Sequence, residues 1–219
     1  MTLTRHTPPW LCAATLALAL CAAPLSVLAM DDATFIDAST LLQKAQNGGD
    51  ETTIEANAER WQALVKADPT DPVARAYAGS AVTMQATTTR LPWRKMSFAE
   101  DGLALIDKAL AQLDPEHETQ LLAGTPKALL VRFTAASTFL ALPAMFNRGP
   151  RGEAELQAVL KHPALGASSL GFRGAVWLRA GLTAEKAGDK AAARQWYQQV
   201  VATQAPQAAV AQTRLKTLQ

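Results

Sequence analysis

The sequence lacks a strong charge of either sign. Its 21 lysine and arginine residues stand against 19 aspartate and glutamate residues, which gives a formal charge of +2 over 219 residues. A nearly neutral chain has no electrostatic basis for binding the phosphate backbone of a nucleic acid, so no such partner is expected. Aromatic residues are also scarce, at 6%, and no low-complexity tract interrupts the chain. We therefore expect a folded chain with little disorder beyond its ends.

The amino-terminal apolar run is too short to cross a membrane. Residues 10–23 provide about 14 positions, whereas a spanning helix needs about 20. An arginine and a histidine precede the run, and Pro24 and small residues up to Ala29 follow it. This order is typical of a secretory signal peptide cleaved after Ala29. We predict that residues 1–29 direct export to the periplasm and that residues 30–219 are one mature domain; an uncleaved anchor is the alternative.

Cysteine is nearly absent, and both Cys12 and Cys21 lie within the predicted signal peptide. The mature chain would then have no thiol, disulfide or cysteine metal ligand, so packing alone must stabilise it. Cys21 ends an apolar run, as the lipidated cysteine of a bacterial lipoprotein does, but Leu20 occupies the slot where that signal has Gly, Ala or Ser. Lipidation at Cys21, and with it peripheral membrane association, is the less favoured route.

Long runs of β-branched residues are missing as well, and apolar residues recur at intervals of three and four. This pattern predicts an all-α chain. Glycine and proline residues divide it into segments. The helices are expected at 32–47, 51–67, 72–87, 96–113, 118–142, 152–161, 172–187, 190–204 and 207–218.

Four prolines recur at similar intervals along the chain. Pro69, Pro115, Pro163 and Pro206 each follow an expected helix and lie 46, 48 and 43 residues apart. The repeated unit is therefore a pair of helices. One pair cannot bury its apolar stripe alone, so we expect an α-solenoid of about four antiparallel pairs with a carboxy-terminal capping helix.

One segment carries a family signature. Residues 175–206 read AVWLRAGLTAEKAGDKAAARQWYQQVVATQAP. Trp177 and Gly181 form a large-then-small pair in the first helix, and Ala193 and Tyr197 form a small-then-aromatic pair in the second. In this arrangement the segment resembles a tetratricopeptide repeat, whose small residues let two helices approach while large ones fill the groove opposite.

Two further stretches match this repeat in part. Gly79 follows Pro69 at the expected distance, and Gly102 precedes Pro115 with one extra residue. Asn57 departs from the pattern in a small-residue slot, and no clear motif runs from 118 to 163. The resemblance implies a tetratricopeptide-like solenoid over most of the mature chain, with its sharpest match over about 32 residues.

Paired catalytic residues are also missing. The mature histidines, His117 and His162, stand beside prolines at expected helix ends, where a histidine commonly satisfies the end of the helix. No histidine pair has the spacing of a zinc site, and no glycine-rich run could cradle phosphates. We therefore expect no metal, no cofactor and no enzymatic activity.

Two connections between helices are longer than a tight turn requires, at 87–96 and 143–152. Corresponding turns of a solenoid share one edge, so both should lie side by side. They would form a cationic and aromatic cluster suited to a carboxylate, a phosphate or an acidic peptide segment. The alternative is that both aromatics pack inward as core. The predicted binding residues are Arg90, Trp93, Arg94, Lys95, Phe146, Asn147, Arg148 and Arg151.

The predicted function follows from fold class. A tetratricopeptide-like solenoid implies a non-catalytic exported scaffold that binds another protein or peptide. The alternative is a carrier of a small anionic or lipidic ligand, held in a pocket near Trp93 and Phe146. An open concave groove would favour the scaffold, and a large apolar cavity would favour the carrier.

Overall fold

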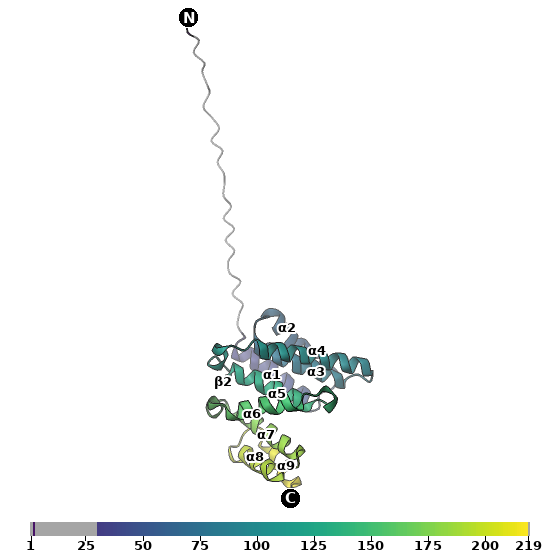
Figure 1. Ribbon diagram of the computed structural model, residues 1–219, viewed down its shortest axis with the longest axis vertical. Coiled ribbons are helices and arrows are strands. Elements are labelled where there is room, and N and C mark those ends of the chain that lie inside the picture. The colour runs from purple at the N-terminus through teal and green to yellow at the C-terminus, as the bar shows by residue number, and fades with distance from the viewer. Residues whose placement is uncertain (1, 3–29, 219) are drawn as a thin grey trace.

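The computed structural model describes residue 2 and residues 30–218, and this part of the chain is almost entirely helical (Figure 1). The predicted signal peptide at 1–29, including Cys12 and Cys21, lies outside these residues except for Thr2. The all-α prediction is confirmed for the described part. Its α-helices are α1 (Asp32–Gln46), α2 (Glu51–Ala67), α3 (Pro72–Met84), α4 (Pro92–Ala111), α5 (Lys127–Ala141), α6 (Gly149–Lys161), α7 (Leu170–Lys186), α8 (Lys190–Ala202) and α9 (Ala208–Thr217).

Aspartate residues begin several of these helices. Asp31, Asp50 and Asp189 each accept a hydrogen bond from the backbone N–H three residues later, at 2.7 to 2.9 Å. Asp71 accepts from two backbone N–H groups at the start of α3. Such caps satisfy donors that a helix leaves unpaired in its first turn. Each of these starts agrees with its sequence prediction to within a residue.

The predicted helix at 118–142 is wrong in its first part. A 3-10 turn, η2 (Pro115–Glu118), is followed by two short antiparallel strands, β1 (Leu121–Leu122) and β2 (Thr125–Pro126), and α5 begins only at Lys127. Between the strands, Ala123 and Gly124 have φ of 47° and 70°, which reverses the chain. The Asp32 carboxylate accepts a 2.7 Å hydrogen bond from the Ala123 N–H and fixes this turn.

The two long connections are shorter than predicted. Pro92 begins α4, so most of the 87–96 stretch is helical, and Gly149 begins α6 within the 143–152 stretch. Proline suits the first turn of a helix because its missing N–H would have no partner there, and this explains both early starts. Trp93, Arg94 and Lys95 therefore belong to the first turn of α4, and Arg151 belongs to that of α6.

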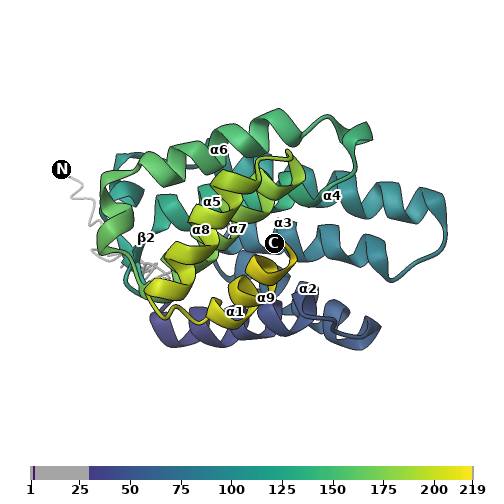
Figure 2. The ribbon, with the colours of Figure 1, turned by 90° about the horizontal axis from the view of Figure 1, so that it is seen from below.

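Neighbouring helices pack in sequence order along the molecule. α3 lies against α4, α5 against α6 and α7 against α8, while α3 also contacts α2 and α5. Figures 1 and 2 show the succession from α1–α4, through α5 and α6, to α7–α9. The main core runs through α1 to α7, and a second core joins α7, α8 and α9.

Glycine permits the closest helix contacts. A Cβ atom on Gly79 of α3 would lie 2.6 Å from the Gly102 carbonyl oxygen of α4, and a Cβ on Gly102 would lie 2.5 Å from the Gly79 oxygen. The two backbones are thus in direct contact. In the last pair, the Tyr197 ring of α8 covers Gly181 of α7. The positions singled out from the sequence as small-residue slots are those at which the helices approach.

An aromatic cluster joins the first three helices. The Trp61 and Tyr77 ring centroids lie 4.5 Å apart, and the Phe35 ring meets both edge-on. Burial raises the pKa of Tyr77 to about 12. No helix in the described residues is long and apolar enough to cross a membrane.

The first prediction concerns the glycine contact in the last helix pair. Gly181→Ala should lower the free energy of unfolding by about 1–3 kcal/mol, because the added Cβ must displace the buried Tyr197 ring. Denaturant unfolding measures the change. The matched control is Gly149→Ala, where a Cβ would have no atom within 4 Å, and a change below about 0.5 kcal/mol is expected. Equal effects of the two substitutions would contradict the packing described.

The second prediction concerns the chain's two tyrosines. Burial raises the pKa of Tyr197 as well, and so does its 2.6 Å hydrogen bond to Glu185. The folded chain should therefore show little tyrosinate absorbance at 295 nm at about pH 11, whereas the denatured chain titrates near pH 10.

The sign of the stability change follows from these pKa values. Below about pH 10 both tyrosines are neutral in the folded and the unfolded state, so their ionisation does not affect stability. Above about pH 10 the tyrosines ionise only in the unfolded chain, and the free energy of unfolding falls as pH rises. Tyr197→Phe leaves Tyr77 as the single reporter. Titration of that variant near pH 10 in the folded state would show that Tyr77 is not buried.

Candidate functional site

One cavity lies among the odd-numbered helices. It has a volume of about 610 Å³ and is lined by residues of α1, α3, α5 and α7 and by the start of α9. No residue of α2, α4, α6 or α8 lines it. The end of α1 and the start of α9, which are about 160 residues apart in sequence, thus line the same cavity.

Helical spacing explains which side chains line this cavity. On α1, Phe35, Ser39, Gln43 and Gln46 follow one another at intervals of three or four residues and so share a face of the helix. The same spacing places Leu130, Phe133 and Ser137 on one face of α5, and Gly171, Ala175, Leu178 and Leu182 on one face of α7.

The cavity wall combines apolar rings with uncharged polar groups. Phe133 of α5 and Phe172 of α7 meet edge-on at 5.3 Å between centroids and form part of the apolar wall. Hydroxyl and amide side chains occupy other positions. The Ser137 hydroxyl and the Gln207 side-chain oxygen are buried without a hydrogen-bond partner. Polar atoms of this kind are rarely left unpaired in a protein interior.

Arg179 of α7 is the charged residue of the lining, which includes no aspartate or glutamate. Its side chain is partly buried, and burial lowers the pKa of its guanidinium from the ordinary value. Arginine remains protonated at neutral pH even so. The cavity therefore presents a positive charge in a setting of hydroxyls, amides and apolar rings.

The predicted edge cluster is divided by the structure. Arg148 and Arg151 both bind Asp107 of α4, at 2.9 and 2.5 Å. Both guanidinium groups also lie over the Phe139 ring, at 5.4 and 5.3 Å from its centroid. These two cations therefore connect α6 to α4 and α5 within the fold.

The remaining cations lie elsewhere. Arg90, Trp93, Arg94 and Lys95 are all exposed near the start of α4, and Trp93 is 66% exposed. Fourteen residues of helix separate Trp93 from Asp107, which corresponds to about 21 Å. The prediction that both connections form one cluster is therefore corrected, because α4 begins early and carries its first turn away from α6.

The aromatic residues of the predicted cluster also differ from each other. Phe146 is partly buried against the core of Leu103, Ile106 and Phe139, so the interpretation of this ring as core is confirmed. Trp93 is exposed and is not among the residues that line the cavity of α1, α3, α5, α7 and α9. Asn147 is exposed in the left-handed conformation, with φ of 50°, and ends a short 3-10 turn.

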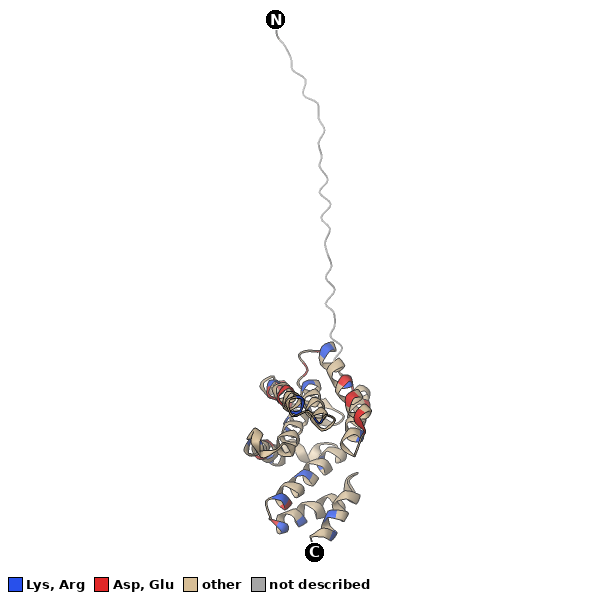
Figure 3. Cartoon of the chain, turned by 90° about the vertical axis from the view of Figure 1, so that its right-hand side faces the viewer, with Lys and Arg blue, Asp and Glu red and all other residues tan. Residues whose placement is uncertain are grey.

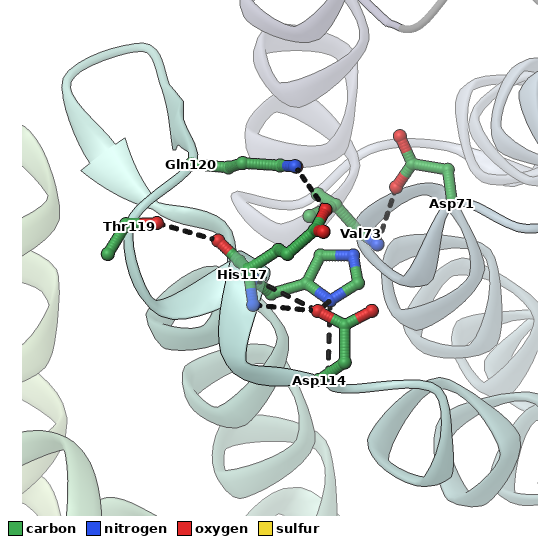
Figure 4. Close-up of polar contacts among 7 residues, drawn as sticks. Asp71, Val73, Asp114, His117, Thr119 and Gln120 are labelled. Atoms are coloured by element: carbon green, nitrogen blue, oxygen red, sulfur yellow. Dashed lines mark hydrogen bonds and ion pairs between the residues drawn. The ribbon is translucent and has the colours of Figure 1, made fainter.

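The two histidines stabilise turns. His117 follows Asp114 at the start of η2, where its Nδ1 accepts a 3.2 Å hydrogen bond from the Asp114 N–H, and the Asp114 carboxylate accepts from the backbone (Figure 4). His162 Nδ1 accepts from the Ala164 N–H, so the proton on Nε2 is directed to Glu118, 3.0 Å away. Both lie at helix ends, as the sequence predicts. The described residues contain no metal-ligating cluster of three such side chains.

The chain shows no significant match to any protein-family model, curated protein or solved structure.

The sequence analysis did not predict the cavity. Ser39, Gln43 and Gln46 of α1 recur with the spacing of one helix face, but Gln43 and Gln46 are exposed, so the sequence alone does not distinguish this stripe from a solvated surface.

The third prediction tests the structural role of Asp107. Asp107→Ala should lower the free energy of unfolding by about 0.5–1.5 kcal/mol, since it leaves two arginines without their carboxylate in a partly exposed site. Glu100→Ala removes an exposed carboxylate of the same helix that has no ion-pair partner among the described residues, and it should have little effect. If both variants unfold at the same denaturant concentration, the ion pairs with Asp107 do not stabilise the fold. Arg148 and Arg151 would then again be candidates for the predicted binding cluster.

Proposed function

We propose that this chain is an exported, non-catalytic scaffold with a tetratricopeptide-like solenoid fold, which binds an extended segment of another protein in its cavity. The observation that carries this proposal is the cavity lining: each of four successive odd-numbered helices contributes to one surface. A segment bound there would contact several repeats at once. Export rests on the predicted signal peptide at 1–29.

The alternation of helices supports a solenoid of helix pairs. In such a fold the first helices of successive pairs form the inner surface, and the second helices form the outer one. α1, α3, α5 and α7 line the cavity, whereas their partners α2, α4, α6 and α8 do not. The glycine contacts between α3 and α4 and between α7 and α8 fit the small-residue slots of the repeat.

The non-catalytic part of the proposal is supported by the chemistry of the lining. Acid–base catalysis needs an acid or base within hydrogen-bonding reach of a substrate, and nucleophilic catalysis needs a base beside the nucleophile. The cavity lining has serines and threonines but no histidine, aspartate or glutamate to activate them.

A small-ligand carrier is the second candidate. A volume of about 610 Å³ falls within the range of small-molecule pockets, roughly 300–1,000 Å³. This cavity lies away from Trp93 and Phe146, so a carrier would use α1, α5 and α7 rather than the predicted edge. The two candidates differ in ligand length, because a carrier encloses its ligand whereas a scaffold lets a peptide extend beyond the cavity.

The fourth prediction tests cavity binding. Peptides selected from a random library on the purified chain should bind Ala175→Trp at least 10-fold more weakly, since the indole would occupy the cavity wall. Ala191→Trp, which adds the same ring to an exposed position of α8, should bind normally. Circular dichroism confirms that both variants fold. Undiminished binding to a folded Ala175→Trp variant would place peptide binding outside the cavity.

Selection also separates the two candidates. If no peptide is selected but a small molecule stabilises the chain against heat, and Ala175→Trp abolishes that stabilisation, the carrier is correct and the scaffold is not.

A further inference from the structure

The described part of the chain contains eleven arginines, and their surroundings set one apart. Eight of them donate hydrogen bonds to protein oxygens or pair with carboxylates: Arg60, Arg75, Arg132, Arg148, Arg151, Arg173, Arg194 and Arg214. Arg90 and Arg94 are exposed and are solvated by water. Arg179 is the described arginine that is partly buried and has neither an ion pair nor a side-chain hydrogen bond.

An unpaired guanidinium is costly in such a place. Burial removes water from a charged group, and the loss is restored only by a paired or hydrogen-bonding partner. No aspartate or glutamate is among the described residues that line the cavity, so this lining supplies no counter-charge. Desolvation by burial lowers the pKa of the Arg179 guanidinium.

The helices at the carboxy-terminal end of the chain carry a net charge of the same sign as Arg179. From residue 163 to the end of the sequence there are seven basic and two acidic residues, whereas residues 30–68 have eight acidic and three basic residues. Figure 3 shows acidic residues gathered towards the upper part of the molecule and mostly Lys and Arg on the helices nearest the C-terminus. α7 and α9 also begin at the cavity wall, and neither Ser169 nor Gln207 forms a side-chain cap there.

We propose that Arg179 binds a carboxylate of the ligand, and that the rest of this ligand is apolar. Since this rests on the proposed function, the ligand is a protein segment with one carboxylate, either an acidic side chain or a chain end. The planar guanidinium fork matches a carboxylate, and one cation balances one negative charge. Phe133, Phe172 and Leu178 of the lining offer apolar contact.

The first arm of the test needs no peptide. Sodium octanoate and octanamide share a chain length and differ in charge. Octanoate should shift the Arg179 Nε–Hε resonance in the nuclear magnetic resonance spectrum of the chain, and octanamide should bind at least 10-fold more weakly. Arg179→Gln should abolish octanoate binding, while Arg94→Gln, which removes an exposed cation of the predicted edge, should leave it unchanged. Equal binding of the two probes, or unchanged binding by Arg179→Gln, would overturn the proposal.

A stability measurement keeps the result independent of folding defects. Because Arg179 has no partner in the unliganded chain, Arg179→Gln should unfold at the same temperature as the parent or at a higher one. A lower unfolding temperature would mean that Arg179 has a structural partner, and the proposal would fail.

The second arm uses peptides from the selection described above. Amidation of the chain end identifies that end as the source of the carboxylate, and Glu→Gln or Asp→Asn exchange identifies an acidic side chain. The change that removes the carboxylate should weaken peptide binding to the parent chain at least 10-fold, and it should not weaken binding to the Arg179→Gln variant. Peptides that Ala175→Trp blocks but Arg179→Gln does not would support the scaffold and overturn the carboxylate site. If octanoate binds at Arg179 but no peptide is selected, the carboxylate site is supported and the peptide scaffold is overturned.

Discussion

The fold depends on how closely its helices can approach each other. At Gly79 and Gly102 the backbones of α3 and α4 touch, and at Gly181 a tyrosine ring of α8 rests on the backbone of α7. Packing at this distance buries the apolar stripe of each helix against its neighbour. The described residues contain no disulfide or metal cluster, so this burial must stabilise the fold. The direction of each helix, and with it the face that looks into the cavity, is fixed by these contacts.

Local signals in the sequence predicted the helices well. Aspartate caps and proline positions act within a few residues of the helix ends that they define, so they can be read directly from the sequence. The same local reasoning failed at Ala123, where an alanine adopts positive φ because the distant Asp32 binds its N–H. It also failed at Pro92, which was interpreted as part of a loop although proline commonly begins a helix.

The site was predicted less well, because its properties arise between helices. Arg148 and Arg151 looked like free cations in the sequence, yet Asp107, more than forty residues earlier, binds both. Conversely, Arg179 lies in an ordinary amphipathic helix and gives no local signal. Its distinction is the absence of any carboxylate among the described residues that line its cavity, and that absence becomes visible only when the helices are assembled.

A stable chain gains nothing from an unpaired arginine in a partly closed cavity. Replacing Arg179 by an uncharged residue of similar size would remove the desolvation penalty. Asn57 and Trp61 also carry buried polar atoms without partners, but they are uncharged and lie in the core, where no ligand can reach them. Arg179 differs because its charge faces an open volume, so the same cost can be offset by an anion entering from outside.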